Sequence, residues 1–131
     1  MFSANWIYNA WSDHFRKTLL GGHFEGGISF DKDTLYLRFA NNQRNYVSYE
    51  IKFLDGHLMI LTSDKVFEGS DIRKGIVQFK EIENQPIYKI VNDPSDRWIC
   101  FIFNNRMELW FKGLDRKSTR LNSSHTDISR M

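Results

Sequence analysis

From residue 24 onward, apolar and polar residues alternate in short runs spaced about ten residues apart and separated by turn residues, a pattern typical of antiparallel all-β structure. The clearest run spans residues 46–62 and is interrupted by Asp55-Gly56, a strong pair for a two-residue type I′ turn. This turn fixes the register of a β-hairpin. It sets one group of residues beside another on a single face: Tyr49, Ile51 and Phe53 beside Leu58, Ile60 and Thr62.

A second hairpin is predicted over residues 97–112, with Asn104-Asn105 as its two-residue turn. Asparagine tolerates a positive φ better than other non-glycine residues do. The resulting register pairs Cys100 with Leu109 and Trp98 with Phe111. It predicts one wholly apolar face, made of Trp98, Cys100, Ile102, Met107, Leu109 and Phe111. We expect this face to be the densest part of the core.

Residues 5–20 instead have helical spacing, because Ile7, Trp11, Phe15 and Leu19 follow one another at steps of four. Gly21-Gly22 is suited to end this helix. We expect the helix to cover the apolar side of a sheet or to close one end of it. Between the hairpins, strands are predicted at 24–30, 34–40, 75–82 and 87–91, and Leu35, Leu37 and Phe39 share a face.

The predicted fold is therefore mainly β: a single antiparallel meander of about eight to nine strands, forming a barrel or rolled sheet after one N-terminal amphipathic helix. The expected organisation is a helix at 1–22 packed on the sheet, an antiparallel β domain at 23–114, and a separate tail at 115–131. Loops 41–45 and 63–74 are the predicted partner-facing segments, because binding residues are often carried by loops.

The tail differs from the body in charge and in origin. Residues 1–114 hold 14 basic and 14 acidic residues, whereas 115–131 hold four basic and two acidic ones, so the tail supplies the whole net charge of +2. Residues 115–125 read DRKSTRLNSSH and resemble a forward translation of a high-throughput sequencing adapter, and the closing Ser129-Arg130-Met131 matches later adapter text. We interpret 115–131 as non-native adapter read-through, and we expect it to be disordered or loosely structured.

The body lacks a signature of catalysis or metal binding. His14, His23 and His57 are scattered, no HxH, HExxH or CxxC spacing occurs, and Cys100 is the single cysteine. We therefore predict a protein that is not an enzyme, with no cofactor and no metal. A neutral body argues against nucleic acid as a partner. No apolar run of membrane-spanning length is present, so no membrane partner is expected and cytoplasmic localisation is predicted. The oligomeric state stays open.

A helix followed by Leu20-Gly21-Gly22-His23-Phe24 and a run of meandering strands resembles the lipocalin-like (calycin) β-barrels. Gly22-His23-Phe24 would be the counterpart of the Gly-x-Trp element with which those families enter their first strand. The resemblance implies a closed sheet and a cavity for one small apolar molecule. The implied ligand-binding residues are Tyr49, Trp98, Cys100 and Phe111, with the Tyr49 hydroxyl orienting the ligand.

The alternative hypothesis is a structural or protein-interaction β module whose core is filled by its own side chains. Fold analogy does not choose between the two. An internal cavity of about 300 Å³ or more favours ligand binding, and a filled interior favours the interaction module.

Overall fold

One helix and a long series of strands make up most of the structure, a computed structural model that describes residues 5–54, 57–65, 67, 69–112 and 119–123. Helix α1 (Asn5–Leu19) leads into β1 (His23–Ser29), β2 (Thr34–Ala40), β3 (Tyr46–Leu54) and β4 (His57–Ser63). The short helix α2 (Gly69–Lys74), strand β5 (Ile76–Gln78) and the 3-10 helix η1 (Lys80–Ile82) follow. Strands β6 (Ile87–Asp93), β7 (Trp98–Phe103), β8 (Met107–Lys112) and β9 (Thr119–Ser123) come last.

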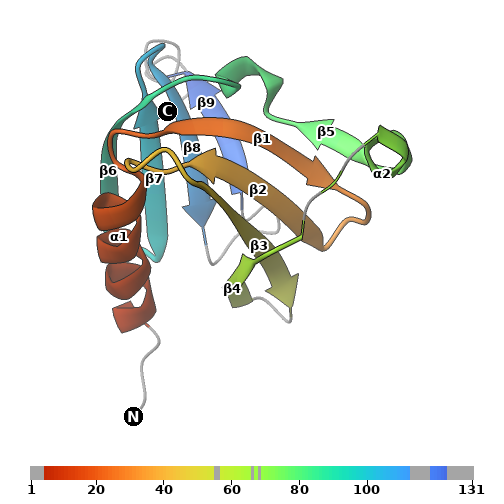
Figure 1. Cartoon of the computed structure of the whole chain (residues 1–131). Helices are drawn as coiled ribbons and strands as arrows, with labels where there is room; N and C mark the ends of the chain where they lie inside the picture. Colours follow the sequence, from red (N-terminus) through yellow and green to blue (C-terminus); the bar gives the residue numbers. More distant parts are fainter. Residues whose placement is uncertain (1–4, 55–56, 66, 68, 113–118, 124–131) are drawn as a thin grey trace.

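The strands form two antiparallel sheets (Figure 1). Sheet A has the order β4-β3-β2-β1-β5, and sheet B has the order β6-β7-β8-β9. The mainly antiparallel β fold behind an N-terminal helix is confirmed. The chain forms two sheets where a single meander was predicted, and β5 pairs with β1 rather than with β4. No pairing among the described strands closes either sheet into a barrel.

The two sheets are joined where the segment after η1 runs beside the start of β1. Asn84 N donates to Phe24 O over 2.7 Å, Phe24 N donates to Gln85 O over 3.1 Å, and Ile87 N donates to Gly22 O over 2.9 Å. These backbone bonds continue the edge of sheet A into the first strand of sheet B. The chain thus changes sheets without leaving its polar backbone groups unpaired at this corner.

Helix α1 ends at the predicted pair of glycines. Gly21 has φ +92°, a left-handed conformation that ends helices and favours glycine. A Cβ on Gly22 would lie 2.0 Å from the carbonyl oxygen of Ala40, so the helix end lies directly against β2. In the last turn of the helix, Arg16 donates from Nε to Ile90 O over 3.0 Å and from Nη2 to Asn92 Oδ1 over 2.7 Å. These bonds attach α1 to β6, the edge strand of sheet B.

The β3–β4 hairpin has the predicted register. Tyr49 pairs with Thr62, Ile51 with Ile60, and Phe53 with Leu58. The turn residues 55–56 lie outside the described residues. On β2, Leu37 and Phe39 are buried as predicted and Leu35 packs against the same core. The two-residue turn therefore predicted the inward face of sheet A.

The register predicted for the β7–β8 hairpin is wrong by one residue. Phe101 pairs with Leu109 and Ile99 with Phe111, so the loop contains a third residue, Arg106, with φ +70°. One extra residue in the turn moves every side chain of one strand to the other face. Trp98 and Leu109 therefore lie on opposite sides of sheet B. The β7 residues that face the core are Ile99, Phe101 and Phe103.

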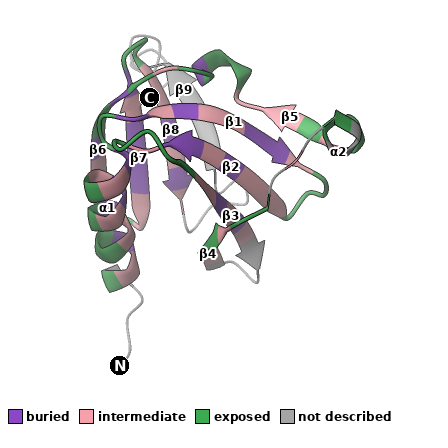
Figure 2. Ribbon diagram, viewed as in Figure 1, coloured by how far each residue is buried: buried purple, intermediate pink, exposed green. Residues whose placement is uncertain are grey.

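The core lies between the two sheets, where aromatic rings from both pack together with α1. Buried residues line the facing sides of both sheets (Figure 2). Phe39 of sheet A stacks on Phe101 of sheet B at a centroid distance of 5.6 Å, and Phe15 of α1 contacts Phe101 at 5.1 Å. The helix stripe differs slightly from the predicted one: Tyr8, Phe15 and Leu19 are buried, whereas Trp11 is partly exposed.

Part of the tail takes strand conformation, since Thr119–Ser123 form β9 and pair with β8. The rest of 115–131 lies outside the described residues. Strand pairing uses main-chain groups that every non-proline residue carries. The origin of the tail therefore stays a prediction, because pairing with β8 does not depend on where these residues come from.

Glycine substitutions test the corrected hairpin. Arg106→Gly should leave the free energy of unfolding unchanged or raise it by up to about 1 kcal/mol, because it removes a non-glycine residue from the left-handed region. Asn105→Gly should lower it by about 1 kcal/mol or more, because Asn105 Oδ1 accepts from Met107 N and its Nδ2 donates to Glu81 O. Urea denaturation measures both. Stabilisation by Asn105→Gly together with destabilisation by Arg106→Gly would instead support the two-residue turn.

Candidate functional site

The structure brings only two of the four predicted ligand-binding residues into the interior. Tyr49 and Phe111 are both buried and both contact Phe15, at centroid distances of 5.2 and 6.4 Å. Trp98 and Cys100 lie on the other face of sheet B because of the register correction. There Trp98 packs against Trp110 at 4.8 Å. The third residue of the turn, Arg106, is the cause of this difference from the prediction.

The interior between the sheets is filled by side chains. Ring centroids in this layer lie 5–6.5 Å apart, the usual spacing of edge-to-face and offset aromatic pairs. The rings are those of Phe15, Phe24, Phe39, Tyr49, Phe101, Phe103 and Phe111. Hollows of about 390 and 260 Å³ lie beside this layer and on the outer face of sheet A.

One hollow lies between α1 and the open edge of β3. It has a volume of about 390 Å³. Strand β4 stops at Ser63, opposite Ser48, so Tyr46 and Val47 extend beyond the paired part of β3 on that side. Both sheet and helix contribute to the lining, which includes His14, Thr18, Tyr46, Val47, Tyr49 and Thr62.

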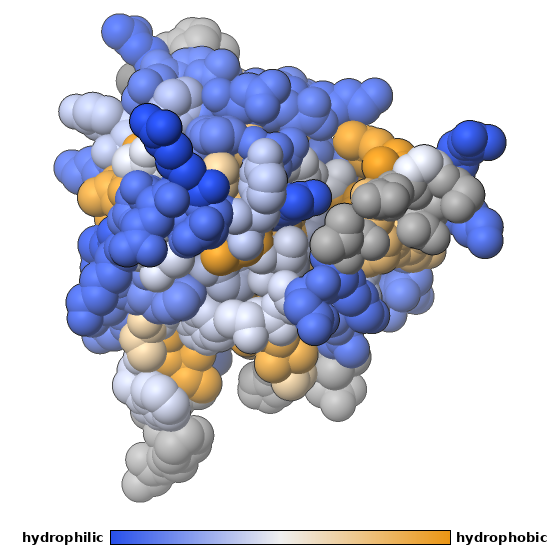
Figure 3. All heavy atoms as spheres, viewed as in Figure 1, coloured by the Kyte–Doolittle hydropathy of each residue, from blue (hydrophilic) through white to orange (hydrophobic). Residues whose placement is uncertain are grey.

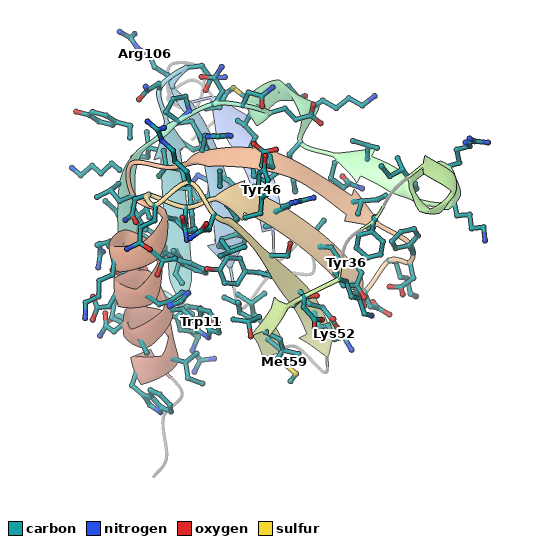
Figure 4. The ribbon with its side chains drawn as sticks, in the orientation of Figure 1. Trp11, Tyr36, Tyr46, Lys52, Met59 and Arg106 are labelled. Carbon is teal, nitrogen blue, oxygen red and sulfur yellow. The ribbon has the colours of Figure 1, made fainter. Side chains whose placement is uncertain are left out.

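His14 and Tyr49 form the polar centre of this hollow. The Tyr49 hydroxyl lies 2.9 Å from His14 Nε2, and Trp11 packs edge-on against both rings at 5.3 and 5.9 Å. Figure 4 shows Trp11 projecting from α1 toward sheet A. Burial lowers the pKa of His14 and raises the pKa of Tyr49 to about 12. Both groups are therefore neutral near pH 7.

Neutral imidazole and phenol groups donate and accept hydrogen bonds without adding charge. They suit a polar, uncharged partner such as a peptide backbone. In the sequence, His14 is one of several scattered histidines, and Trp11 belongs to the apolar stripe of the predicted helix. Trp11 and His14 are three residues apart, a spacing that places two side chains on one face of a helix. This spacing is the feature of the sequence that indicates their proximity.

The second feature is the β4 edge of sheet A, beside which no strand of the described residues pairs. Strand β4 is seven residues long and contains no charged residue and no proline. Met59 and Leu61 are 41% and 43% exposed. Edge strands usually carry charges, prolines or covering segments that prevent pairing with another chain. Because β4 contains no charged residue and no proline, this edge can pair with another chain.

The described residues contain no group of three or more His, Cys, Asp or Glu placed to hold a metal ion. None of the helices in the described ranges has the length and apolarity needed to cross a bilayer.

Comparisons with known proteins bear on the fold. No protein-family model matches the chain, and a search of curated proteins also gives no match. Among solved structures, the crystal structure of the N-terminal domain of fibronectin-binding protein PavA from Streptococcus pneumoniae is similar, with a TM-score of 0.59 and 14% sequence identity. The match covers 89% of this chain and 47% of that one, so the chain spans about half the length of the solved domain. This likeness is one of fold.

The His14–Tyr49 contact predicts a pH dependence of stability. Because the pKa of His14 is lower in the folded state than in the unfolded state, the unfolded chain binds more protons as the pH falls. The stabilising contribution is complete above the unfolded pKa of about 6.5 and is lost as the pH falls toward the folded pKa. In urea denaturation between pH 7.5 and 5, the free energy of unfolding should fall.

The His14→Gln variant provides the comparison. It keeps a polar side chain near Tyr49 but cannot titrate, so its stability should fall less over the same interval. Parallel curves for the two proteins would show that His14 is not a source of the pH dependence.

Proposed function

We propose that this protein is a non-catalytic interaction module whose partner is an extended polypeptide segment that pairs with the edge of β4. The observation that carries the proposal is the unprotected apolar edge of sheet A. An extended segment that adds to a sheet edge gains main-chain hydrogen bonds, and its alternate side chains provide specificity. The cytoplasmic localisation predicted above remains part of this proposal.

Among the edge strands β4, β5 and β6, the features of the strands favour β4. Strand β5, at the other edge of sheet A, is only three residues long. Strand β6, at one edge of sheet B, carries Lys89 and Asp93 and is bound by Arg16 of α1. Strand β4 has neither protection, and its exposed Met59 and Leu61 would meet apolar side chains of an added strand.

The hollow beside α1 extends this edge. An added strand that runs past Ser63 would reach Tyr46 and Val47, where β3 has no partner from β4. There, His14 and Tyr49 offer neutral hydrogen-bonding groups. The edge and the hollow together form a continuous path for a segment longer than β4 itself.

The filled interior gives less support to the first hypothesis, a small apolar ligand between the sheets. The aromatic layer occupies the space that such a ligand would need. The similar solved domain belongs to a protein named for binding fibronectin. A protein partner is thus compatible with this fold, but a likeness at 14% identity does not extend to the partner.

Peptide selection on the immobilised full chain tests the proposal. A displayed library of random dodecapeptides serves as the probe, and selected peptides are resynthesised and measured by fluorescence anisotropy. Leu61→Lys, which places a charge on the β4 edge, should weaken binding by about tenfold or more. The matched control Ile76→Lys, at an exposed position of β5, should leave binding unchanged.

Backbone methylation of the selected peptide separates strand pairing from side-chain contact. Methylation of alternate peptide nitrogens on one edge should abolish binding, and methylation of the other edge should leave it intact, because only one edge pairs with β4. Equal binding by both forms, or equal binding to Leu61→Lys, would contradict the proposal. Self-association of the chain that Leu61→Lys abolishes would assign the edge to a second copy and would also overturn it.

A further inference from the structure

A groove on the outer face of sheet A has features that the proposed function does not use. Its volume is about 260 Å³. Its floor is formed by β1, β2, β3 and β5, and Phe67 together with Ile72 of α2 forms one wall. This face of the molecule is turned toward the viewer in Figure 3, where apolar surface lies near β5 and α2 on the right. The groove lies across the sheet from the aromatic core.

One half of the groove is apolar. Ile28 and Val77 are cross-strand partners on its floor, and Phe67 and Ile72 belong to the wall. The ring of Phe67 lies 4.9 Å from the ring of Tyr36, which closes the apolar half toward β2. An aromatic or short aliphatic group placed here would contact side chains on two sides, and its transfer from water would be favourable.

A glycine keeps the floor open. A Cβ built on Gly26 would meet nothing within 4 Å, so the space above this residue is empty rather than filled by a neighbour. Gly26 lies opposite Arg38 on β2. The absence of a side chain at this position therefore connects the apolar half to the charged half.

The charged half presents two cations and hydroxyl groups. Arg38 pairs with Ser48, and Ser48 pairs with Ser63, which forms a cross-strand row on the outer face. The Arg38 guanidinium lies 4.2 Å from the centre of the Tyr46 ring. Lys65 Nζ donates to the Tyr36 hydroxyl over 3.2 Å. Figure 4 shows Tyr36 and Tyr46 on this face.

Both cations are oriented by aromatic side chains. Within the described part of the chain, neither Arg38 nor Lys65 forms a salt bridge with a carboxylate. The carboxylates of Glu50 and Asp64 act on Lys65 electrostatically without forming a salt bridge with it. The positive charge of Arg38 and Lys65 is thus only partly compensated and can attract an anionic ligand. Glu25 and Glu83 also line the groove, and the Glu25 carboxylate contacts the His23 ring. An anionic group would therefore lie on the side of Ser48 and Lys65, away from these carboxylates.

We propose that this groove binds a small amphipathic carboxylate, with an aromatic or short aliphatic body over Ile28, Tyr36 and Val77 and its carboxylate between Arg38 and Lys65. Charge complementarity selects an anion, because the cations lie beside hydroxyl groups that also donate hydrogen bonds. The apolar half selects a hydrocarbon body over a free inorganic anion. This site lies on the outer face of sheet A rather than along the β4 edge, and it shares Arg38, Ser48 and Lys65 with the hollow beside that edge.

Isothermal titration calorimetry with 4-phenylbutyrate and its uncharged amide tests the charge requirement. The two molecules share their aromatic body and differ in the carboxylate. The acid should bind the full-length chain, and the affinity of the amide should be lower by about tenfold or more. Arg38→Gln should weaken binding of the acid to the level of the amide, whereas Lys32→Gln, which removes an exposed cation outside the groove, should not.

A pair of glycine variants tests the location. Gly26→Val adds a side chain into the empty floor and should weaken binding of 4-phenylbutyrate by about tenfold or more. Gly69→Val serves as the matched control, because a Cβ there also meets nothing within 4 Å and Gly69 does not line the groove. Thermal unfolding verifies that each variant folds. Undetectable binding to the wild type, equal binding of acid and amide, or full binding by a folded Gly26→Val variant would each overturn the proposal.

Discussion

Ring packing between the two sheets is the interaction on which the rest of this structure depends. Phe101 of β7 contacts Phe39 of sheet A, Phe15 of α1 and Phe111 of β8 at 5.1–5.6 Å. A sheet with one apolar face must bury it against another element, and here each sheet serves the other. The helix completes the layer at the side of β6 rather than covering a whole sheet. Because close-packed rings leave little free volume, the two binding surfaces proposed above lie outside this layer.

Two hairpin turns determine how much of this fold can be predicted from the sequence. Asp55-Gly56 has a turn chemistry that few alternatives match, so the register of β3 and β4 and the inward position of Tyr49 follow from it. Asn104-Asn105 suits the same turn, yet the chain adds Arg106 in a left-handed conformation that is usually occupied by glycine. An arginine gives no local indication of that conformation. Strand β7 is apolar on both faces, so its pattern does not show which face is turned inward. A two-residue turn would place Trp98 and Cys100 in the interior, and the three-residue turn places them on the other face.

The candidate sites depend on contacts between residues that are far apart in the sequence, and local patterns do not predict such contacts. The meeting of His14 with Tyr49 joins α1 to β3, across 35 positions of the chain. The groove requires the order of strands in sheet A, because β5 reaches β1 only after the chain has passed through β4 and α2. A local pattern predicts which face a residue occupies, but not which distant strand lies beside it. The predicted partner-facing loop 63–74 contains Lys65, Phe67 and Ile72, which line the groove, and its role in binding stays a prediction.

The two surfaces proposed for binding share part of their lining. Arg38, Ser48 and Lys65 border both the groove and the hollow at the open edge of β3. A carboxylate held by Arg38 and Lys65 would neutralise positive charge beside the path of an added strand. A strand that lies along Tyr46 would in turn affect the ring that orients the Arg38 guanidinium. If both ligands contact this shared row, each changes the affinity of the other by the same factor, because coupling between binding free energies is reciprocal. The outer face of sheet A would then act as one linked surface, supported from behind by a core that contributes rigidity rather than a cavity.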